Sequence, residues 1–507
     1  MIRRSRRLTL GIDRNLLVLI IISALIRVVF LRVYQPASFD DTLGYIDTGE
    51  ALQAMDWARY SAARTPLYPL LMIATGFSFQ VIWLVQSLMG LGTATMLYWL
   101  ARYHVGDERI AFAIGLSYSL AINMLFFEAA ILTETMSAFL LLLSLLLFIL
   151  SRRRHRRLTF HVATAVVASL AVLTRPLLLL LVPLYLLFFI RRWKERGYDA
   201  FSRRRYLAGY VLPVVILLGG VILFNGWKTG SFSLSTLTGY NLVGHSGAFM
   251  EDAPDEYATI RDIYLKHREA RIAATGSRIW TIWDAQGEMR QTTGLDFVGL
   301  NDALTRLSLQ LIVTHPLTYL GNVAIAWANF WASTIPWNLD NLSLPVSRTI
   351  LDGLWWMVRW LLILTNFTFL LICLYSLRER RRKYRLLNYD AEFHWLILSL
   401  ILGTSLLQAL LIFADNWRFS VPYQPLIIYA VVIWLWLFSL RRQQRQTVIG
   451  TEAPGRAGPK EDGDDKQARA VRRLARSGEP RGGELDLDLL TDILDGGRSW
   501  PGAEEEE

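Results

Sequence analysis

The chain has 507 residues, of which 53% are hydrophobic and 12% aromatic, and its formal net charge is +10. This composition is more apolar than a soluble domain of that length needs, and it predicts an all-α polytopic membrane protein. The positive charge does not indicate nucleic-acid binding, because the basic residues cluster beside apolar runs, where they set membrane orientation. The single cysteine, Cys373, excludes an intramolecular disulfide and a cysteine-ligated metal site.

The N-terminal end of the chain is basic, with five arginines before residue 15, which places it in the cytoplasm. The first apolar run, residues 16–33, has no small-residue cleavage site after it, so we expect a retained span rather than a removed signal peptide. Residues 34–79 then form the first external loop. This loop opens with an acidic pair and contains Pro66 and Pro69, which are typical of the start of a short interfacial helix.

Later apolar runs predict nine further spans. Residues 80–102, residues 110–125 and a run that ends at residue 150 precede the basic segment RRRHRR. The next apolar stretch has to go out and return in two legs of about 15 residues each, against the roughly 20 expected for a span. These legs turn at Thr174, Arg175 and Pro176, because proline ends the ascending helix. The last spans cover residues 206–224, 350–377, 393–413 and 421–440, which gives ten crossings with both termini inside.

Two polar regions complete the predicted organisation. Residues 225–349 form an external insertion with some helix, outside the spans of a transmembrane domain that covers residues 1–440. Within the insertion, residues 316–337 are rich in tryptophan, and the parity of the spans favours an interfacial helix over a crossing, which the pattern alone leaves open. Residues 441–507 predict a disordered cytoplasmic tail in which LDLDLLTDILDGG has the pattern of one short amphipathic helix.

Polar residues at the outer face of the predicted bundle include both carboxylates and arginines. They are Asp40, Asp41, Tyr45, Arg64, Glu128, Glu134, Arg175, His245 and Arg418. A carboxylate can remove a proton as a general base while guanidinium groups stabilise a leaving phosphate. The sequence has no GxxxxGK[ST] loop, no GxSxG elbow and no His/Cys metal-ligand spacing. An activated phosphate substrate at this face must therefore be carried there on a lipid.

Five short motifs follow one another on the outer side. They are FDD with Tyr45 after the first span, RTPLYP before the second, LTE between the third and fourth, LTRP after the fifth and NWRFSVPYQP before the last. This order resembles the GT-C membrane glycosyltransferases, and within them it is most similar to the branch of protein O-mannosyltransferases and aminoarabinose transferases of lipid A. The likeness covers residues 10–230 and part of residues 390–440. It implies a GT-C-like bundle with juxtamembrane helices on its outer face.

The resemblance implies different roles for the two members of the acidic pair. Asp40 would be the general base that takes a proton from the acceptor hydroxyl, and Asp41 would orient the acceptor or a cation. The pair is Asp-Asp where the superfamily more often has Asp-Glu, so the resemblance leaves open whether a divalent cation is a cofactor.

The resemblance also implies a site for the phosphate of the donor. Arg64 and Tyr68 would shape the cavity and contact the donor head group, while Arg175 would lie near the lipid phosphate. Arg418 would bind that phosphate as it leaves. The residues alone also allow a second interpretation for Arg64 and Arg175, in which they anchor helix ends among lipid head groups.

Three residues are candidates for the cavity and the acceptor. Tyr45 and Glu134 would face the same cavity as the donor, although Glu134 also suits a polar cap at a helix N-terminus. His245 lies in a segment with two glycines that could cover the acceptor, although a lone histidine is more often structural.

The resemblance implies an inverting glycosyltransferase that moves a hexosyl or pentosyl group from a polyprenyl-phosphate carrier to a lipid, glycan or protein acceptor. We expect it to act on the outer face of a bacterial plasma membrane. Two alternatives are a lipid-linked saccharide transporter or flippase and a non-catalytic protein of envelope assembly. A transporter is expected to place ionisable groups at mid-membrane in repeated halves, whereas the charged residues here gather at one face. The insertion is not that of either named group, so the sugar and the acceptor stay open.

Overall fold

The computed structural model describes residues 11–153, 158–195, 197–333, 335–336, 338–343, 348–379, 391–414 and 416–451. Within these residues the chain is helical, with two isolated β-bridges and no strand. It separates into two compact units, residues 1–440 and 441–507. The second unit is described only at its start, where residues 441–451 continue the helix α20 (Gln424–Thr451). The predicted tail therefore begins as helix, and its predicted amphipathic segment lies outside the described residues.

Eight helical segments of the described chain are long and apolar enough to cross a membrane, or up to ten if each of two bent pairs is one span. Their helices are α1 (Arg14–Val33), α4 (Phe79–Val105), α7 (Glu134–Arg153), α9 (Leu181–Glu195), α10 (Ala200–Val214) continued by α11 (Gly220–Thr229), α17 (Arg348–Glu379), α18 (Ala391–Leu411) and α20. These segments match eight of the ten predicted spans. The prediction of an all-α multi-pass membrane protein is confirmed.

The other two predicted spans are helical but depart from a regular crossing. The third is a pair bent by 52°, α5 (Glu108–Ser119) and α6 (Ile122–Ala129), and the fifth is the 17-residue helix α8 (Leu158–Thr174). After α8 the backbone is extended at Arg175, and a short 3-10 helix (Pro176–Leu180) leads into α9. The chain therefore turns at the predicted tripeptide, as expected for a proline that ends a helix.

A second bent pair occupies the segment predicted to lie at the interface. Helix α15 (Phe297–Thr314) and helix α16 (Pro316–Phe330) meet at 108°. The proline at the first position of α16 begins a new helix rather than continuing the old one. Because this bent pair is one of the two that could each form a span, the interfacial placement of residues 316–337 stays a prediction.

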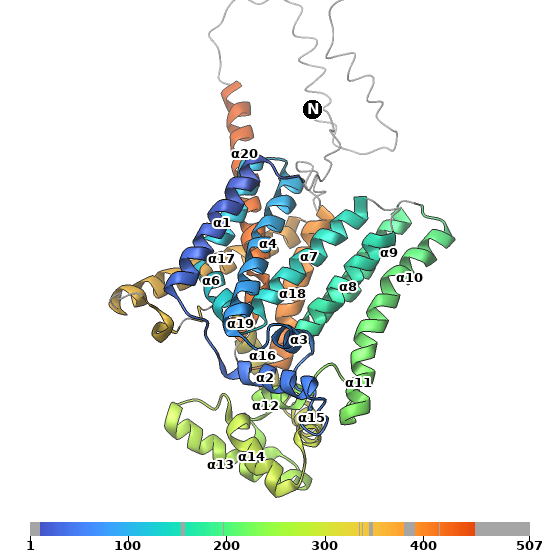
Figure 1. Cartoon of the computed structure of the whole chain (residues 1–507), viewed down its shortest axis with the longest axis vertical. Helices are drawn as coiled ribbons and strands as arrows, with labels where there is room; N and C mark the ends of the chain where they lie inside the picture. The colour runs from blue at the N-terminus through green and yellow to red at the C-terminus, as the bar shows by residue number, and fades with distance from the viewer. Residues whose placement is uncertain are drawn as a thin grey trace, which may run out of the picture. The chain divides into compact units, whose positions relative to one another are not determined.

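Helices α12 (Thr238–Ser246), α13 (Ala258–Thr275), α14 (Thr281–Thr293) and α15 make up most of the predicted insertion. They enclose a hydrophobic core of their own, which includes Tyr240, Val243, Tyr264, Met289 and Leu304. Figure 1 shows these helices at one end of the bundle, next to α2 (Asp40–Gln53) and α3 (Leu67–Ala74). The segments that the sequence predicts to be external therefore gather at one end of the fold.

The opposite end is fixed by a polar cluster between α1 and α4. Asp13 caps α1 by accepting from the amide of Leu16 at 2.9 Å, and it also accepts from the hydroxyl of Tyr98 at 2.7 Å. The same carboxylate forms an ion pair with Arg102 near the end of α4. These contacts bring the start of α1 next to the end of α4, so the two helices run antiparallel.

Two backbone bridges hold the start of the first external loop. Residues Tyr34 and Leu342 form one bridge, and Ala37 and Ala130 form the other. At the second bridge the amide of Ile131 donates to the carbonyl of Ala37 at 2.9 Å. The loop thus starts beside the turn between α6 and α7, which positions the acidic pair next to the LTE motif.

Candidate active site

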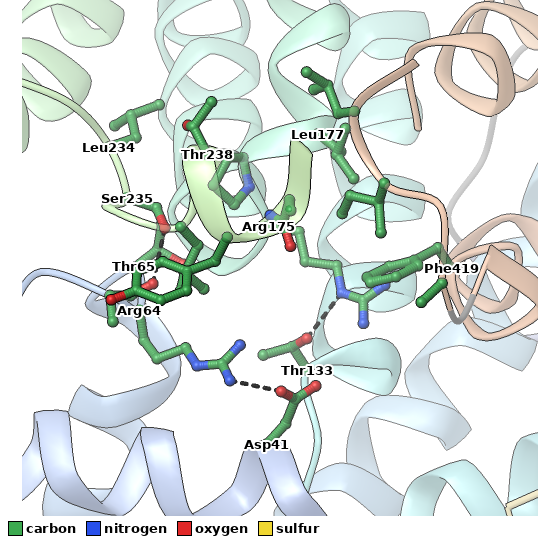
Figure 2. Close-up of a pocket in the computed structure, with 18 of the residues that line it drawn as sticks. Asp41, Arg64, Thr65, Thr133, Arg175, Leu177, Leu234, Ser235, Thr238 and Phe419 are labelled. Carbon is green, nitrogen blue, oxygen red and sulfur yellow. Dashed lines mark hydrogen bonds and ion pairs between the residues drawn. The ribbon is translucent and has the colours of Figure 1, made fainter. Parts of the chain in front are cut away.

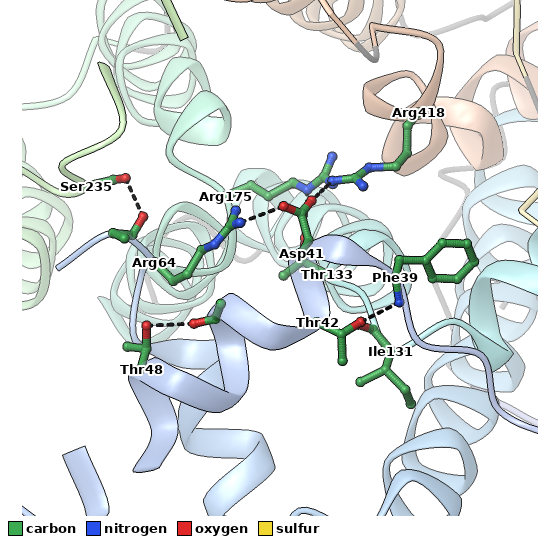
Figure 3. A network of polar contacts seen from close by, with 12 residues as sticks. Phe39, Asp41, Thr42, Thr48, Arg64, Ile131, Thr133, Arg175, Ser235 and Arg418 are labelled. Carbon is green, nitrogen blue, oxygen red and sulfur yellow. Dashed lines mark hydrogen bonds and ion pairs between the residues drawn. The ribbon is translucent and has the colours of Figure 1, made fainter. Parts of the chain in front are cut away.

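Helix α2 presents the acidic pair in its first turn, where a negative charge interacts favourably with the helix dipole. The hydroxyl of Thr42 accepts from the amide of Phe39 at 2.9 Å and donates to the carbonyl of Ile131 at 3.0 Å (Figure 3). Successive helical residues point about 100° apart, so only one member of the pair can face inward. The contacts of Thr42 with Phe39 and Ile131 hold the first turn of α2 in the rotation in which Asp41 contacts two arginines.

Asp41 lies between two arginines that come from distant parts of the chain. Its Oδ1 accepts from Nη2 of Arg64 at 2.6 Å, and its Oδ2 forms an ion pair with Arg418 (Figure 3). Burial alone would raise the pKa of this carboxyl, but the two guanidinium groups outweigh it and hold the pKa of Asp41 well below its usual range. Asp41 is therefore ionised at neutral pH.

A second carboxylate lies beneath this pair. Glu134 Oε1 accepts from Nη2 of Arg175 at 2.5 Å and lies 2.9 Å from Nε of Arg418. Arg175 also donates through Nε to the hydroxyl of Thr133 at 2.8 Å (Figure 2). We refer to Asp41, Arg64, Glu134, Arg175 and Arg418 as the site cluster. It contains three cations and two carboxylates, so it has formal charge left for one more anion.

The shape of the loop leaves space for these arginines. A Cβ atom at Gly44 would lie 2.8 Å from Nε of Arg64, so a larger residue there would displace the guanidinium group. The guanidinium group of Arg64 lies over the ring of Tyr45 at 5.1 Å, and that of Arg175 lies over Phe419 at 4.9 Å. Cation–π contacts of this kind orient each guanidinium group without using its hydrogen-bond donors.

Two cavities meet at the site cluster. The first has a volume of about 510 Å³ and is largely apolar, with leucine side chains from the segment after α8 and from α18 in its wall. The second has a volume of about 1310 Å³ and is bordered by polar side chains of α2 and α14. We call them the apolar and the polar cavity. Seven residues line both, namely Asp41, Ala63, Arg64, Leu237, Trp280, Trp283 and Arg418.

The predicted site residues fall into two groups. Arg64, Arg175, Arg418, Asp41 and Tyr45 line the apolar cavity, and Figure 2 shows Asp41, Arg64 and Arg175 among the residues that line it. Residues 41–64, Arg175 and Arg418 are more than 100 positions apart from one another in the sequence, and the structure brings them together at this cavity.

Asp40 and Tyr68 lie elsewhere. Asp40 is exposed and borders only the polar cavity. Tyr68 is fully buried beneath Tyr45, with ring centroids 5.0 Å apart, and its hydroxyl donates to Gln86 at 3.1 Å. Tyr68 lines neither cavity and supports the aromatic ring that does.

Glu134 and His245 are also buried outside the two cavities. Glu134 lies under the arginines rather than in the cavity wall. His245 packs against Tyr319 and Phe413, with ring centroids at 5.2 and 5.6 Å. Burial and the nearby charge of Arg278 lower the pKa of His245 to about 4, so it is neutral at physiological pH. The histidine that was expected to cover the acceptor is instead part of the packing beside it.

Three residues of the site were not predicted. Thr133, within the LTE motif, accepts a hydrogen bond from Arg175. Its side chain is uncharged, so the motif alone favours its charged neighbour Glu134. Trp280 and Trp283 line both cavities from the start of α14. Two tryptophans three residues apart in an otherwise polar segment are an unusual pattern, and this signal could have identified them.

The site cluster does not suit a divalent cation. Each oxygen of Asp41 is held by a guanidinium group. The described residues contain no group of three or more His, Cys, Asp or Glu side chains that could hold a metal ion. Divalent cations in proteins need several such oxygen ligands, so we derive no step through a metal.

No protein-family model matches the chain, and no curated protein does. Similar solved structures include the archaeal oligosaccharyltransferase AglB from Archaeoglobus fulgidus, in complex with an inhibitory peptide and a dolichol-phosphate. AglB and this chain are 13% identical, with a TM-score of 0.43, and the match covers 95% of this chain and 58% of the AglB chain. ArnT from Cupriavidus metallidurans, bound to undecaprenyl phosphate, is 14% identical with a TM-score of 0.34, over 82% of this chain and 77% of that chain. Both are GT-C membrane glycosyltransferases, the superfamily that the ordered motifs resemble.

Proposed function

We propose that the chain is an inverting glycosyltransferase that moves a sugar from a polyprenyl-phosphate carrier to an acceptor on the outer face of a bacterial plasma membrane. One observation carries the proposal. Asp41, flanked by Arg64 and Arg418, lies where the apolar cavity meets the polar cavity. A base and phosphate-binding groups thus occur together at the boundary between a lipid-compatible and a water-compatible space.

The apolar cavity suits the carrier. Its leucine-lined wall matches an isoprenoid chain, and Arg64, Arg175 and Arg418 at its polar end match a phosphate. The formal excess of one positive charge in the site cluster favours an anionic ligand over a neutral one. The basic residues at the end of α9 and the start of α10 lie at the end of the bundle opposite α2 in Figure 1, which favours an outer-face site with cytoplasmic termini.

The chemistry needs one base and a stabilised leaving group. The acceptor oxygen forms a bond to the anomeric carbon while the bond from that carbon to the phosphate oxygen breaks. The electron pair of the broken bond leaves with the polyprenyl phosphate, whose charge the three arginines stabilise. The proton of the acceptor hydroxyl passes to Asp41, and attack opposite to the leaving group inverts the anomeric centre.

This proposal assigns the base to Asp41, whereas the family resemblance assigns it to Asp40. The reason is geometric, because Asp41 borders both cavities and Asp40 borders one. An incoming phosphate also competes with Asp41 for Arg64 and Arg418. Binding of the donor therefore frees the carboxylate and raises its basicity at the stage when a base is needed.

The test is turnover of a panel of radiolabelled polyprenyl-phosphate sugars by the purified full chain in lipid nanodiscs. The variants are Asp41→Asn and, as a matched control on the same helical turn, Asp40→Asn. We expect Asp41→Asn to lower sugar release or transfer on the order of 100-fold or more, and Asp40→Asn to change it by a few-fold at most.

The opposite result for the two variants would return the role of base to Asp40. If the folded wild-type protein turned over no donor in the presence of candidate acceptors, the glycosyltransferase proposal would fail. A lipid-translocation assay on the same nanodiscs would then test the transporter alternative. The active member of the panel identifies the donor sugar.

A further inference from the structure

The polar cavity is large and its charges are balanced. Its volume of about 1310 Å³ exceeds the roughly 300–1,000 Å³ that encloses a typical small ligand. The described residues that line it include five aspartates and five arginines. Several of these are already paired, since Arg271 donates to Asp284 at 2.5 Å and Arg59 contacts both Asp47 and Glu50. A cavity of this kind offers many hydrogen bonds and no net charge.

The lining of the polar cavity includes four aromatic residues. Trp280 and Trp283 line both cavities, and Phe297 and Trp417 line the polar cavity. Trp283 is held in place because it stacks on Tyr240 with ring centroids 5.4 Å apart. The polar cavity therefore offers aromatic rings as well as hydrogen-bonding groups.

Trp280 has an unusual backbone conformation. Its φ angle is +74°, in the left-handed region that a bulky residue rarely adopts. Neighbouring contacts hold this turn, since Arg278 donates to the carbonyl of Gly244 at 2.6 Å and Thr281 donates to the carbonyl of Arg278 at 2.7 Å. The side chain remains 40% exposed although tryptophan is large and apolar. Strain of this kind persists where the surroundings impose it, and it is concentrated at functional sites.

We infer that the polar cavity binds an uncharged saccharide as the acceptor, with Trp280 as the platform on which one sugar ring stacks. The inference rests on the proposed function, because it identifies the second substrate of the same site. The C–H face of a pyranose ring is apolar and packs on an indole, while its hydroxyl edge donates to carboxylates and accepts from guanidinium and amide N–H groups. Trp280 and Asp41 line the same two cavities, so we expect a ring stacked on Trp280 to lie near the base.

The balance of charge distinguishes a neutral saccharide from other acceptors. A strongly anionic glycan or lipid head group needs an excess of cations, and a basic peptide needs an excess of carboxylates. The polar cavity has neither excess, and its size accommodates more than a single sugar. An uncharged oligosaccharide satisfies both conditions.

The test measures binding without a donor. The full chain in nanodiscs is titrated with neutral oligosaccharides of mannose, glucose, galactose and N-acetylglucosamine, with acidic oligosaccharides of uronic acids, and with a basic peptide. We expect at least one neutral oligosaccharide to bind, and Trp280→Ala to weaken that binding by about tenfold, since one aromatic stacking contact supplies an effect of this size. Trp227→Ala is the matched control, because Trp227 is 74% exposed and borders neither cavity.

A second variant at the same position distinguishes the effect of losing the indole from the effect of the strained backbone. Trp280→Gly removes the indole and fits a φ of +74° without strain, whereas Trp280→Ala removes the indole and keeps the strain. Both variants should therefore lose saccharide binding to the same extent, and Trp280→Gly should unfold at a higher temperature than Trp280→Ala. This comparison shows whether lost binding arises from the missing indole rather than from a misfolded turn.

Three outcomes overturn the inference. They are binding of only charged ligands, binding of no ligand, and unchanged binding in Trp280→Ala. The assay of donor turnover is independent of these measurements. If donor is consumed with a non-saccharide acceptor, the inference fails while the proposed function stands. If a neutral saccharide binds at Trp280 but no lipid-linked donor is consumed, the inference stands while the proposed function fails.

Discussion

The site cluster and the Arg27–Glu128 pair use the same kinds of side chain in different surroundings. Arg27 of α1 donates to Glu128 of α6 through Nε at 2.9 Å and through Nη2 at 2.6 Å. These two side chains are 5% and 1% exposed, and they line neither cavity. Asp41 and Arg64, in contrast, are 23% and 20% exposed and line both.

The two groups differ in whether a ligand can reach them from a cavity. A closed ion pair cannot exchange its partner for a ligand, so Arg27 and Glu128 serve to join α1 to α6. An open cluster with an unbalanced charge can exchange partners, so Asp41 and its arginines are suited to binding and chemistry. Charged residues at one face of a membrane protein therefore need to be separated by their access to a cavity before a role is assigned.

The largest expected effect concerns the closed pair. Glu128→Gln leaves Arg27 buried without a counter-charge, and we expect the free energy of unfolding to fall by about 3–5 kcal/mol. Asp41→Asn should lower the free energy of unfolding by about 1 kcal/mol or less, because Arg64 and Arg418 line a cavity in which water can solvate their charge. Denaturant unfolding of both variants in detergent micelles measures the two changes. Equal losses would remove the distinction between a closed and an open cluster.

Two glycines test the same distinction, because Gly90 lies beside the Arg27–Glu128 pair and Gly44 lies beside Arg64 of the site cluster. A Cβ atom at Gly90 would lie 1.9 Å from Oε1 of Glu128 and 2.7 Å from Nη2 of Arg27. Gly90→Ala should therefore lower the free energy of unfolding by about 1–3 kcal/mol, because neither partner can move in the packed bundle. Gly44→Ala displaces only the mobile end of Arg64, so it should leave stability nearly unchanged and raise the KM for the donor.

Thermal unfolding and donor kinetics of the two glycine variants provide the measurement. Gly44→Ser, which adds a similar Cβ, should behave like Gly44→Ala. If Gly90→Ala changed the KM for the donor while leaving stability intact, the Arg27–Glu128 pair would have to be coupled to the site.

The smallest expected effect is a dependence of stability on pH. The pKa of Asp41 is lower in the folded protein than in the unfolded chain, because Arg64 and Arg418 outweigh its burial. The stabilisation by ionised Asp41 is therefore complete above the unfolded pKa of about 3.9 and is lost as the pH falls toward the folded value. The stability of the wild type should fall more steeply below pH 4 than that of Asp41→Asn. Parallel curves would mean that the arginines do not hold Asp41 in the folded state.

Much of the fold follows from local features of the sequence. The apolar runs locate the spans, because a helix that crosses the bilayer needs about 20 apolar residues. The turn at Arg175 follows from the adjacent proline, and the bend before α16 likewise begins at a proline. The four-helix core of the insertion could not be predicted in the same way, because contacts such as that between Gly239 of α12 and Asn301 of α15 join residues 62 positions apart.

The site was predictable as a set of residues but not as an arrangement. The motifs predict that Asp41, Arg64, Arg175 and Arg418 come together, and the structure places them around one cavity. The choice between Asp40 and Asp41 depends on the rotation of α2, which is determined by contacts of its first turn with the α6–α7 turn. Such tertiary contacts leave no periodic pattern in the sequence. For the same reason, the burial of Tyr68, Glu134 and His245 could not be predicted from residue type.

The wall shared by the two cavities has a kinetic consequence. Under the proposed function, the carrier would occupy the apolar cavity and the acceptor the polar cavity, so neither substrate would have to bind before the other. Initial-velocity patterns should accordingly be those of random-order binding. An obligatory order of binding would instead mean that one substrate completes the binding site of the other across the shared wall.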